Sequence, residues 1–276
     1  MADRLTPAER LDQLPLAPSS LAGAPGLIER ARAGAAGELF REFWKYTPPA
    51  DFIDGLNGCQ ICEPRISGLD QTGVRKRALS EAGGDLAGIQ DQESAERFPL
   101  ADAALLIAGD MILIDVEGEP RQRIEIDYDA GLSKPVVLRL APGARVHLTE
   151  QVRTESFLNH SLYVHLSQDA VLEHAFTATS GGGSHWAMTQ VHQAAGSRYR
   201  RQQYLTGANR RRSETQIILN GPDASTEVTG AYVIEGGTHL DQQIVLEHRA
   251  RNTTSRQRFH GIGAGKGTAV FNGRIH

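Results

Sequence analysis

Turn residues recur at nearly equal spacing through the second half of the chain, and this repeat constrains the fold more than any other feature. They are Gly143, Asp169, Gly196, Asp223 and Asn252, which lie 26, 27, 27 and 29 residues apart. A second, glycine-rich set falls between them, at Gly182, Gly207, Gly236 and Gly263. Between the turns, apolar and polar residues alternate with the period of a β-strand. Each repeat therefore consists of two strands and two turns.

A fixed period of this length favours stacked units that share a continuous core, as in a β-helix or another solenoid. Successive hairpins of an antiparallel sandwich would give similar spacing, so the period alone leaves both folds open. The stretch Ala269 to His276 has the pattern of another repeat, with no turn or cap after it. A solenoid that stopped there would present an unpaired edge. We therefore expect that the chain is cut off before the natural end of its fold.

The chain divides into an N-terminal region over residues 1–103, predicted to be helical and irregular, and a β core over residues 104–276. The division rests on a change of period, because strand-like alternation begins at about residue 104. It is clear from Met111 to Val116 and again from Ile124 to Tyr128. The predicted fold class is therefore mainly β, preceded by helices.

Helix signals are confined to the N-terminal region. The sequence Thr6-Pro7-Ala8-Glu9 has the pattern of a capping box with proline at the first helical position, which predicts a short helix. Apolar residues keep helical spacing from Leu27 to Trp44, and Pro48-Pro49 ends that helix. Weak helices are also predicted over residues 70–80 and 91–98.

The charge balance and hydropathy exclude several classes of protein. Lys and Arg number 29 against 33 Asp and Glu, so no global positive field attracts phosphate backbones and a nucleic-acid partner is not expected. The N-terminus lacks the apolar core of a secretory signal, and the longest apolar stretch, Ala103 to Ala108, is far too short to span a bilayer. We therefore predict a cytoplasmic protein without a membrane partner.

Cys59 and Cys62 form a Cys-x-x-Cys pair, which in other contexts binds metal or carries redox chemistry. A zinc or cluster site needs further ligands, but the sequence holds no third cysteine. A thioredoxin-type motif needs a βαβ context that this segment lacks, and a structural disulfide is not expected in a reducing cytoplasm. We interpret the pair as two loop thiols of unassigned role.

The glycine-rich run from Gly261 to Thr268 looks like a phosphate-binding loop at first sight. A P-loop needs glycine five positions before its Gly-Lys pair and Ser or Thr directly after it, whereas this chain has His260 and Gly267 there. No helix is predicted to follow and to direct its dipole at a phosphate. We therefore interpret this run as a turn of the repeat.

Catalytic and metal-binding motifs are also absent from the sequence. All ten histidines lie from His147 onward, but none forms a His-x-His or His-Glu-x-x-His motif. The run Ser180 to His185 lacks the Gly-x-Ser-x-Gly elbow, and Arg210 to Arg212 has the pattern of a solvated corner. No residue is therefore assigned to catalysis, cofactor binding or metal. A histidine-ligated, cupin-like β-barrel enzyme is the alternative function. A carbohydrate-active β-helix would carry a secretion signal and clustered carboxylates.

Two parts of the chain resemble the SufB/SufD family of SUF iron-sulfur cluster assembly proteins. Trp44-Lys45-Tyr46-Thr47-Pro48, placed after an N-terminal helix, resembles the opening signature of the SufD branch. The β region resembles the family core at Gly230, Tyr232, His239, Asp241, His248, Ser255, Gly261 and the closing stretch Ala269 to Ile275. The resemblance runs from about residue 38 to the last residue. Its closing stretch, with Phe271, Asn272 and Gly273, is the most specific part.

This resemblance implies a right-handed parallel β-helix and a non-catalytic scaffold subunit of an ATPase-driven assembly complex. The implied partners are a SufB-like paralogue and the ABC ATPase SufC, and the implied cofactor is an iron-sulfur cluster held only transiently in the assembled complex. Family members continue with more β-helix and a helical domain that docks SufC, so we expect the docking region to be missing here. The signature residues Trp44 to Pro48, His239, Asp241, His248, Ser255 and Phe271 to Gly273 are therefore expected to have scaffold roles.

Overall fold

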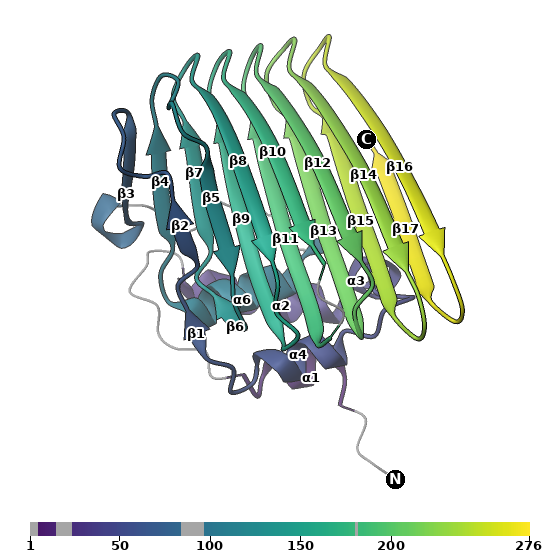
Figure 1. The fold of residues 1–276 in the computed structure, drawn as a ribbon. Helices are drawn as coiled ribbons and strands as arrows, with labels where there is room; N and C mark the ends of the chain where they lie inside the picture. The colour runs from purple at the N-terminus through teal and green to yellow at the C-terminus, as the bar shows by residue number, and fades with distance from the viewer. Residues whose placement is uncertain (1–4, 15–23, 84–96, 180–181) are drawn as a thin grey trace.

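The computed structural model describes residues 5–14, 24–83, 97–179 and 182–276, and it is a parallel β-solenoid with helices along one side (Figure 1). The helices are α1 (Pro7–Leu11), α2 (Ala24–Ala36), α3 (Glu38–Phe43), α4 (Ala50–Leu56), the 3-10 helix η1 (Ser80–Ala82) and α6 (Pro99–Ala108). The predicted fold class is confirmed, and the stacked coils rule out both the antiparallel sandwich and the cupin-like barrel.

The strands of the described residues form two sheets that face each other across the core. The covered sheet contains β3 (Val74–Ala78), β4 (Ile112–Val116), β7 (Val136–Leu140), β9 (Leu158–Leu166), β11 (Ser184–Gln193), β13 (Arg210–Leu219), β15 (His239–His248) and β17 (Thr268–Ile275). Its side strands are β1 (Ile61–Cys62) and β6 (Gly131–Ser133). The open sheet contains β2 (Arg65–Ser67), β5 (Ile124–Tyr128), β8 (Arg145–Val152), β10 (Val171–Ala178), β12 (Arg198–Thr206), β14 (Ser225–Ile234) and β16 (Thr254–Gly263).

From β7 onward, successive strands along the chain alternate between the two sheets, so each coil adds one strand to each. From β5 and β4 onward, all neighbours within a sheet run parallel and in register. In the open sheet, for example, Leu172 lies between Val146 and Tyr199 on the neighbouring coils. The same side-chain position therefore stacks from coil to coil, which is how a solenoid extends one continuous core.

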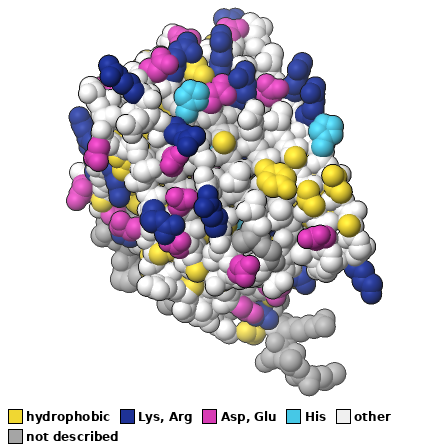
Figure 2. Space-filling model, in the orientation of Figure 1, with side chains coloured by type: hydrophobic (Ala, Val, Ile, Leu, Met, Phe, Trp, Pro, Cys, Tyr) yellow, Lys and Arg dark blue, Asp and Glu magenta, His cyan; other side chains and the backbone are white. Residues whose placement is uncertain are grey.

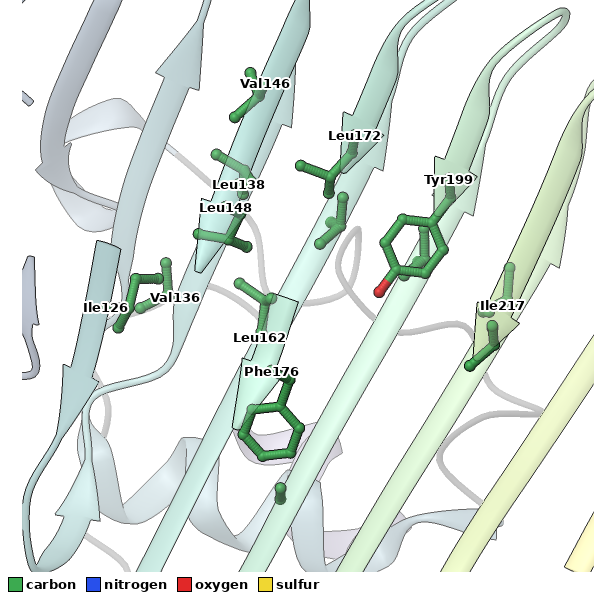
Figure 3. Packing of buried hydrophobic residues seen from close by; sticks show 14 of the residues in the cluster. Ile126, Val136, Leu138, Val146, Leu148, Leu162, Leu172, Phe176, Tyr199 and Ile217 are labelled. Atoms are coloured by element: carbon green, nitrogen blue, oxygen red, sulfur yellow. The ribbon is translucent and has the colours of Figure 1, made fainter. Parts of the chain in front are cut away.

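The core lies between the sheets and consists of aliphatic and aromatic side chains. Figure 3 shows Leu138, Leu148, Leu162, Leu172 and Phe176 pointing into this space from both sheets. The strands of the open sheet bury alternate residues, as β10 and β12 show. Strands β9 and β11 of the covered sheet bury nearly every residue, because helices and loops pack on their outer face.

The predicted turns between the coils are confirmed by their backbone conformation. The backbone angle φ is +71° at Gly143, +58° at Asp169, +64° at Gly196, +60° at Asp223 and +56° at Asn252. This left-handed region favours glycine and tolerates aspartate and asparagine better than other residues. The recurring residue types therefore mark the points where the chain passes from one sheet to the other.

The N-terminal helices differ from the predictions in several places. The capping box is confirmed, since the Glu9 amide donates to Thr6 Oγ1 at 3.3 Å and the Thr6 amide donates to Glu9 Oε2 at 2.7 Å. The helix predicted over residues 27–44 is two helices, because Gly37 separates α2 from α3. The helix predicted over residues 70–80 is wrong. Strand β3 lies there and pairs antiparallel with β4, which satisfies its backbone groups.

Two further features concern the region before the solenoid. Helix α6 occupies Pro99–Ala108, so the strand-like alternation predicted from residue 104 begins only with β4 at Ile112. The helix predicted over residues 91–98 lies largely outside the described residues. Three strands precede residue 104 and pair with later strands, namely β1, β2 and β3. The domain boundary between residues 103 and 104 stays a prediction. In the described part of the chain, no helix has the length and apolar character needed to cross a bilayer.

We expect Leu172→Ala to lower the free energy of unfolding by about 2–5 kcal/mol, because it leaves a cavity where a fully buried side chain packs between coils. The matched change Val171→Ala, on the outer face of the same strand, should cost less than about 1 kcal/mol. Urea unfolding followed by circular dichroism measures both. Equal losses would mean that the two faces of β10 do not differ as described.

Candidate functional site

The signature segment after α3 lies against the outer face of the covered sheet. Trp44 and Thr47 are buried, whereas Lys45, Tyr46 and Pro48 are exposed, with Tyr46 61% accessible. Trp44 packs against aromatic rings of the N-terminal helices. Two of the five signature positions therefore hold this segment on the solenoid, and three face solvent.

Thr47 reaches two signature residues of β15 that lie nearly two hundred positions later in the chain. Its Oγ1 lies 2.8 Å from His239 Nε2 and 2.5 Å from Asp241 Oδ2. A hydroxyl has one proton, which Thr47 donates to the carboxylate, so His239 must donate its Nε2 proton to the Thr47 oxygen. Burial lowers the pKa of His239, with Asp241 opposing that shift, so the neutral ring supplies this donor near pH 7.

A buried charge network surrounds this contact on the same face. Arg212, with no exposed side-chain surface, forms ion pairs with Asp241 Oδ2 and with Glu214 Oε1, the latter at 2.7 Å. The Arg212 guanidinium also lies 3.8 Å from the centre of the Trp44 ring. Trp186 Nε1 donates to Glu214 Oε2 at 2.9 Å. We call Trp44, Thr47, Arg212, His239 and Asp241 the clamp, because they join the N-terminal segment to β13 and β15.

The other signature residues lie away from the centre of the clamp. His248 Nδ1 lies 2.7 Å from Thr253 Oγ1, and its Nε2 lies 3.0 Å from Ser255 Oγ, which ties the end of β15 to β16. Phe271, 46% exposed, packs against Phe259 with ring centres 5.0 Å apart. Asn272 and Gly273 follow on β17, in register with Gln243 and Ile244 of β15. These positions therefore hold successive coils together.

A second polar cluster lies inside the solenoid, where the sequence analysis assigned no function. Glu150 of β8 accepts from Tyr128 Oη at 2.6 Å, and its Oε2 lies 2.6 Å from His174 Nε2 of β10. His174 Nδ1 lies 2.9 Å from Tyr199 Oη. From the covered sheet, His160 stacks on Tyr128 with ring centres 4.0 Å apart. We call this set, with His185 and Arg201, the internal cluster.

The internal cluster is held together across several coils. His160 Nδ1 and His185 Nε2 lie 3.2 Å apart, with their rings stacked. The Arg201 guanidinium lies 5.0 Å from the centre of the Phe176 ring and donates to Thr215 Oγ1 at 3.4 Å. Each residue of the cluster is at most 3% exposed. A solute cannot reach these groups unless the coils open, so the cluster orients strands inside the core.

The protonation states in the internal cluster follow from burial and from its charges. Burial lowers the pKa of His160 to about 4, against the attraction of Glu150, and lowers the pKa of His174 and His185 as well. Burial opposes ionisation of Glu150, but His174, His160 and Arg201 outweigh it and lower its pKa to about 2. The cluster at neutral pH therefore combines neutral imidazoles with an ionised carboxylate.

The cysteine pair and the glycine-rich run occupy ordinary structural positions, whereas the prediction of a solvated corner at Arg210 to Arg212 is wrong, because Arg211 and Arg212 are buried. Burial raises the pKa of the free thiols of Cys59 and Cys62, so they stay protonated near pH 7. Gly261 to Thr268 spans the end of β16 and a turn into β17, with Gly265 at φ +66°, and no helix follows. Within the described ranges, no group of three or more His, Cys, Asp or Glu residues is arranged to hold a metal ion.

Sequence reasoning missed the internal cluster, although a signal for it was present. Strand alternation assigns Glu150 and His174 to the inner face, between apolar neighbours such as Leu148 and Leu172. A polar residue at an inward position predicts a buried polar contact, because an unpaired group there is costly. The partner could not be identified, since it lies on another coil.

Comparison with known families gives one match over most of the solenoid. The family model described as "SUF system FeS cluster assembly, SufBD core domain" matches residues 124–276, which is more than half of the chain. This segment starts with β5 and includes every clamp residue of the solenoid. No curated protein matches the chain.

Thr47→Val should lower the free energy of unfolding by about 1–3 kcal/mol, because it leaves Asp241 and His239 without their shared hydroxyl. Limited proteolysis should also cut the N-terminal segment faster, since the clamp ties it to β15. The matched control is Thr149→Val on the open sheet, which is partly exposed. If both variants are equally stable and equally resistant to protease, the clamp does not hold the segment.

We expect the stability to fall as the pH is lowered from about 6.5 to about 4, because the buried His160 binds its proton only near the lower value. Each such histidine contributes up to about 1.4 kcal/mol per pH unit. Glu150 contributes below this range, since its lowered pKa is about 2. Urea midpoints of His160→Gln should depend less on pH than those of the parent.

Proposed function

Because the chain belongs to the SufBD core family of the SUF system for iron-sulfur cluster assembly, we propose that it is a scaffold subunit of a SUF complex. Its partners would be a SufB-like paralogue and a SufC-like ABC ATPase. The observation that carries the proposal is the extent of the family match, which covers coil after coil of the solenoid rather than one pocket. An extended architecture of this kind suits a subunit that positions others.

The use of the polar residues supports a scaffold role. The internal cluster is closed to solutes. The charged side chains of the clamp contact other residues of the same chain, on β13, on β15 and in the N-terminal segment. Catalytic groups must reach a substrate, whereas these groups are buried inside the protein. We therefore assign the chain a non-catalytic role, with ATP hydrolysis supplied by the SufC-like partner.

We place the chain in the SufD branch on the pentapeptide Trp44 to Pro48. In this proposal Trp44 and Thr47 anchor the segment through Arg212 and Asp241, and the exposed Lys45 and Tyr46 face outward for contacts with partners. The remaining signature positions are scaffold residues that join coils, as the contacts of His248 with Ser255 illustrate.

The iron-sulfur cluster is cargo in this proposal and not a resident cofactor. Common clusters are held by four cysteine thiolates, and this chain has two cysteines, both protonated near neutral pH. The chain alone therefore does not supply a full thiolate set. Most ligands of a nascent cluster would come from the partner subunits.

We expect co-expression with SufB-like and SufC-like proteins from one organism to yield a complex that contains all three chains. Affinity capture through a tag on this chain, followed by size-exclusion chromatography and native mass spectrometry, measures its composition. The isolated chain should contain less than about 0.1 iron per chain, because its donor set is incomplete.

The control is a clamp variant that disrupts the scaffold without touching an exposed residue. Asp241→Asn leaves Arg212 incompletely paired in a buried site and should reduce the yield of the complex together with the stability of the chain. If the well-folded parent captures neither partner under conditions in which the partners bind each other, the scaffold proposal is wrong. Stoichiometric iron in the isolated chain would contradict the assignment of the cluster as cargo.

A further inference from the structure

The outer face of the open sheet lies on the side away from the helices (Figure 1). Alternate side chains of its strands are exposed there, as on β12. Parallel register arranges them in rows that cross the strands. The row nearest the strand starts contains Arg145, Val171, Arg198, Ser225 and Thr254. The next row contains His147, Glu173, Arg200, Glu227 and Arg256. Charged side chains are therefore concentrated over one end of the face.

All residues of these two rows except His147 line a groove across β8, β10, β12, β14 and β16. Arg200 is neutralised within the groove, since it lies 2.9 Å from Glu173 and 3.5 Å from Glu227. The exposed Arg145, Arg198 and Arg256 form no ion pair within the described part of the chain. The groove thus carries a local positive charge on a chain whose net charge is −4.

The other end of the same face is less polar. Farther along the strands one row contains Tyr204, Ala231 and His260, and the next contains Thr206, Val233 and Ile262. Tyr204 is 41% exposed and Ile262 is 68% exposed. Figure 2 shows charged side chains gathered toward the top of this view and hydrophobic ones in a patch below them. A cationic groove and an apolar patch therefore share one uncovered surface.

We propose that this surface binds an acidic segment of a partner protein that also carries apolar side chains. Neighbouring strands lie about 4.8 Å apart, so Arg145 and Arg198, two strands apart, present charges at about 10 Å spacing. Acidic residues two turns apart on a helix, at about 10.8 Å, match this spacing. The patch around Tyr204 and Ile262 would receive the apolar residues, as interface cores do.

A nucleic acid fits this surface less well than an acidic protein segment. Glu173 and Glu227 lie within the groove and would repel a continuous phosphate backbone. On β12, β14 and β16, the two rows that contain Tyr204 and Ile262 hold no Arg or Lys that could pair with phosphates. The surface is separate from the clamp and from the internal cluster, so it would serve whichever subunits the chain joins.

Fluorescence anisotropy with a fluorescein-labelled oligo-glutamate peptide that contains two leucines tests the proposal on the full chain. We expect binding that weakens as salt is raised, because exposed charges are screened. The double variant Arg145→Glu, Arg198→Glu should bind about tenfold more weakly, which corresponds to about 1.4 kcal/mol. The matched variant Arg41→Glu, Arg75→Glu makes the same change in net charge elsewhere and should bind within about twofold of the parent.

A second pair of measurements separates the alternatives. Arg145→Gln, Arg198→Gln removes the charges without reversing them and keeps the test valid if the glutamate variant fails to fold. An oligo-glutamate peptide without leucines should bind more weakly than the parent peptide. Peptide binding that is independent of salt, or equal losses in the groove and control variants, overturns the proposal. If a labelled oligothymidine binds more tightly than the peptide and the groove variant abolishes that binding, the proposal is also overturned, because the surface would then be a nucleic-acid site.

Discussion

Each coil of this protein is stable only against its neighbours, and every other feature follows from that constraint. A single two-strand coil cannot enclose a core, so its inward side chains must stack on the same positions of the next coil. Exact register is therefore required, and the left-handed turns at Gly143, Asp169 and Asn252 supply it by returning the chain at the same point in each repeat. The apolar stack around Leu172 and Tyr199 is the product of that register.

The buried polar groups add specificity to this stack. Apolar residues at inward positions would tolerate a shift of one coil against another, whereas the contacts of Glu150 with Tyr128 and His174 are satisfied in one register only. The clamp acts in the same way on the outer face, because Asp241 needs both Thr47 and Arg212. Buried ion pairs of this kind contribute little net stability, yet removing one partner is costly. They therefore determine which arrangement forms more than how stable it is.

The sequence predicted the repeat and its turns because both depend on local chemistry. Left-handed turns select Gly, Asp and Asn, and strands of the open sheet alternate since one face is exposed. Strand β11 does not alternate, because helices cover its outer face, and the basic run of β3 has no apolar alternation that marks it as a strand. The clamp joins Thr47 to Asp241 across 194 positions. No local pattern encodes such a contact, so only the family resemblance placed both residues in one signature.

The two sheets consequently have different tasks. The outer face of the covered sheet carries the charges of Arg212, Glu214 and Asp241, which pair with one another, and Trp44 and Thr47 of the N-terminal segment contact Arg212 and Asp241. The outer face of the open sheet carries arginines as well, but no segment of the described chain covers them, and of the described arginines that line the groove only Arg200 forms ion pairs. A solenoid that uses one face to bind its own N-terminus leaves the other free for a different chain. Since exposed ion pairs are weak and screened by salt, contacts there would be reversible, which suits a scaffold whose partners and cargo exchange.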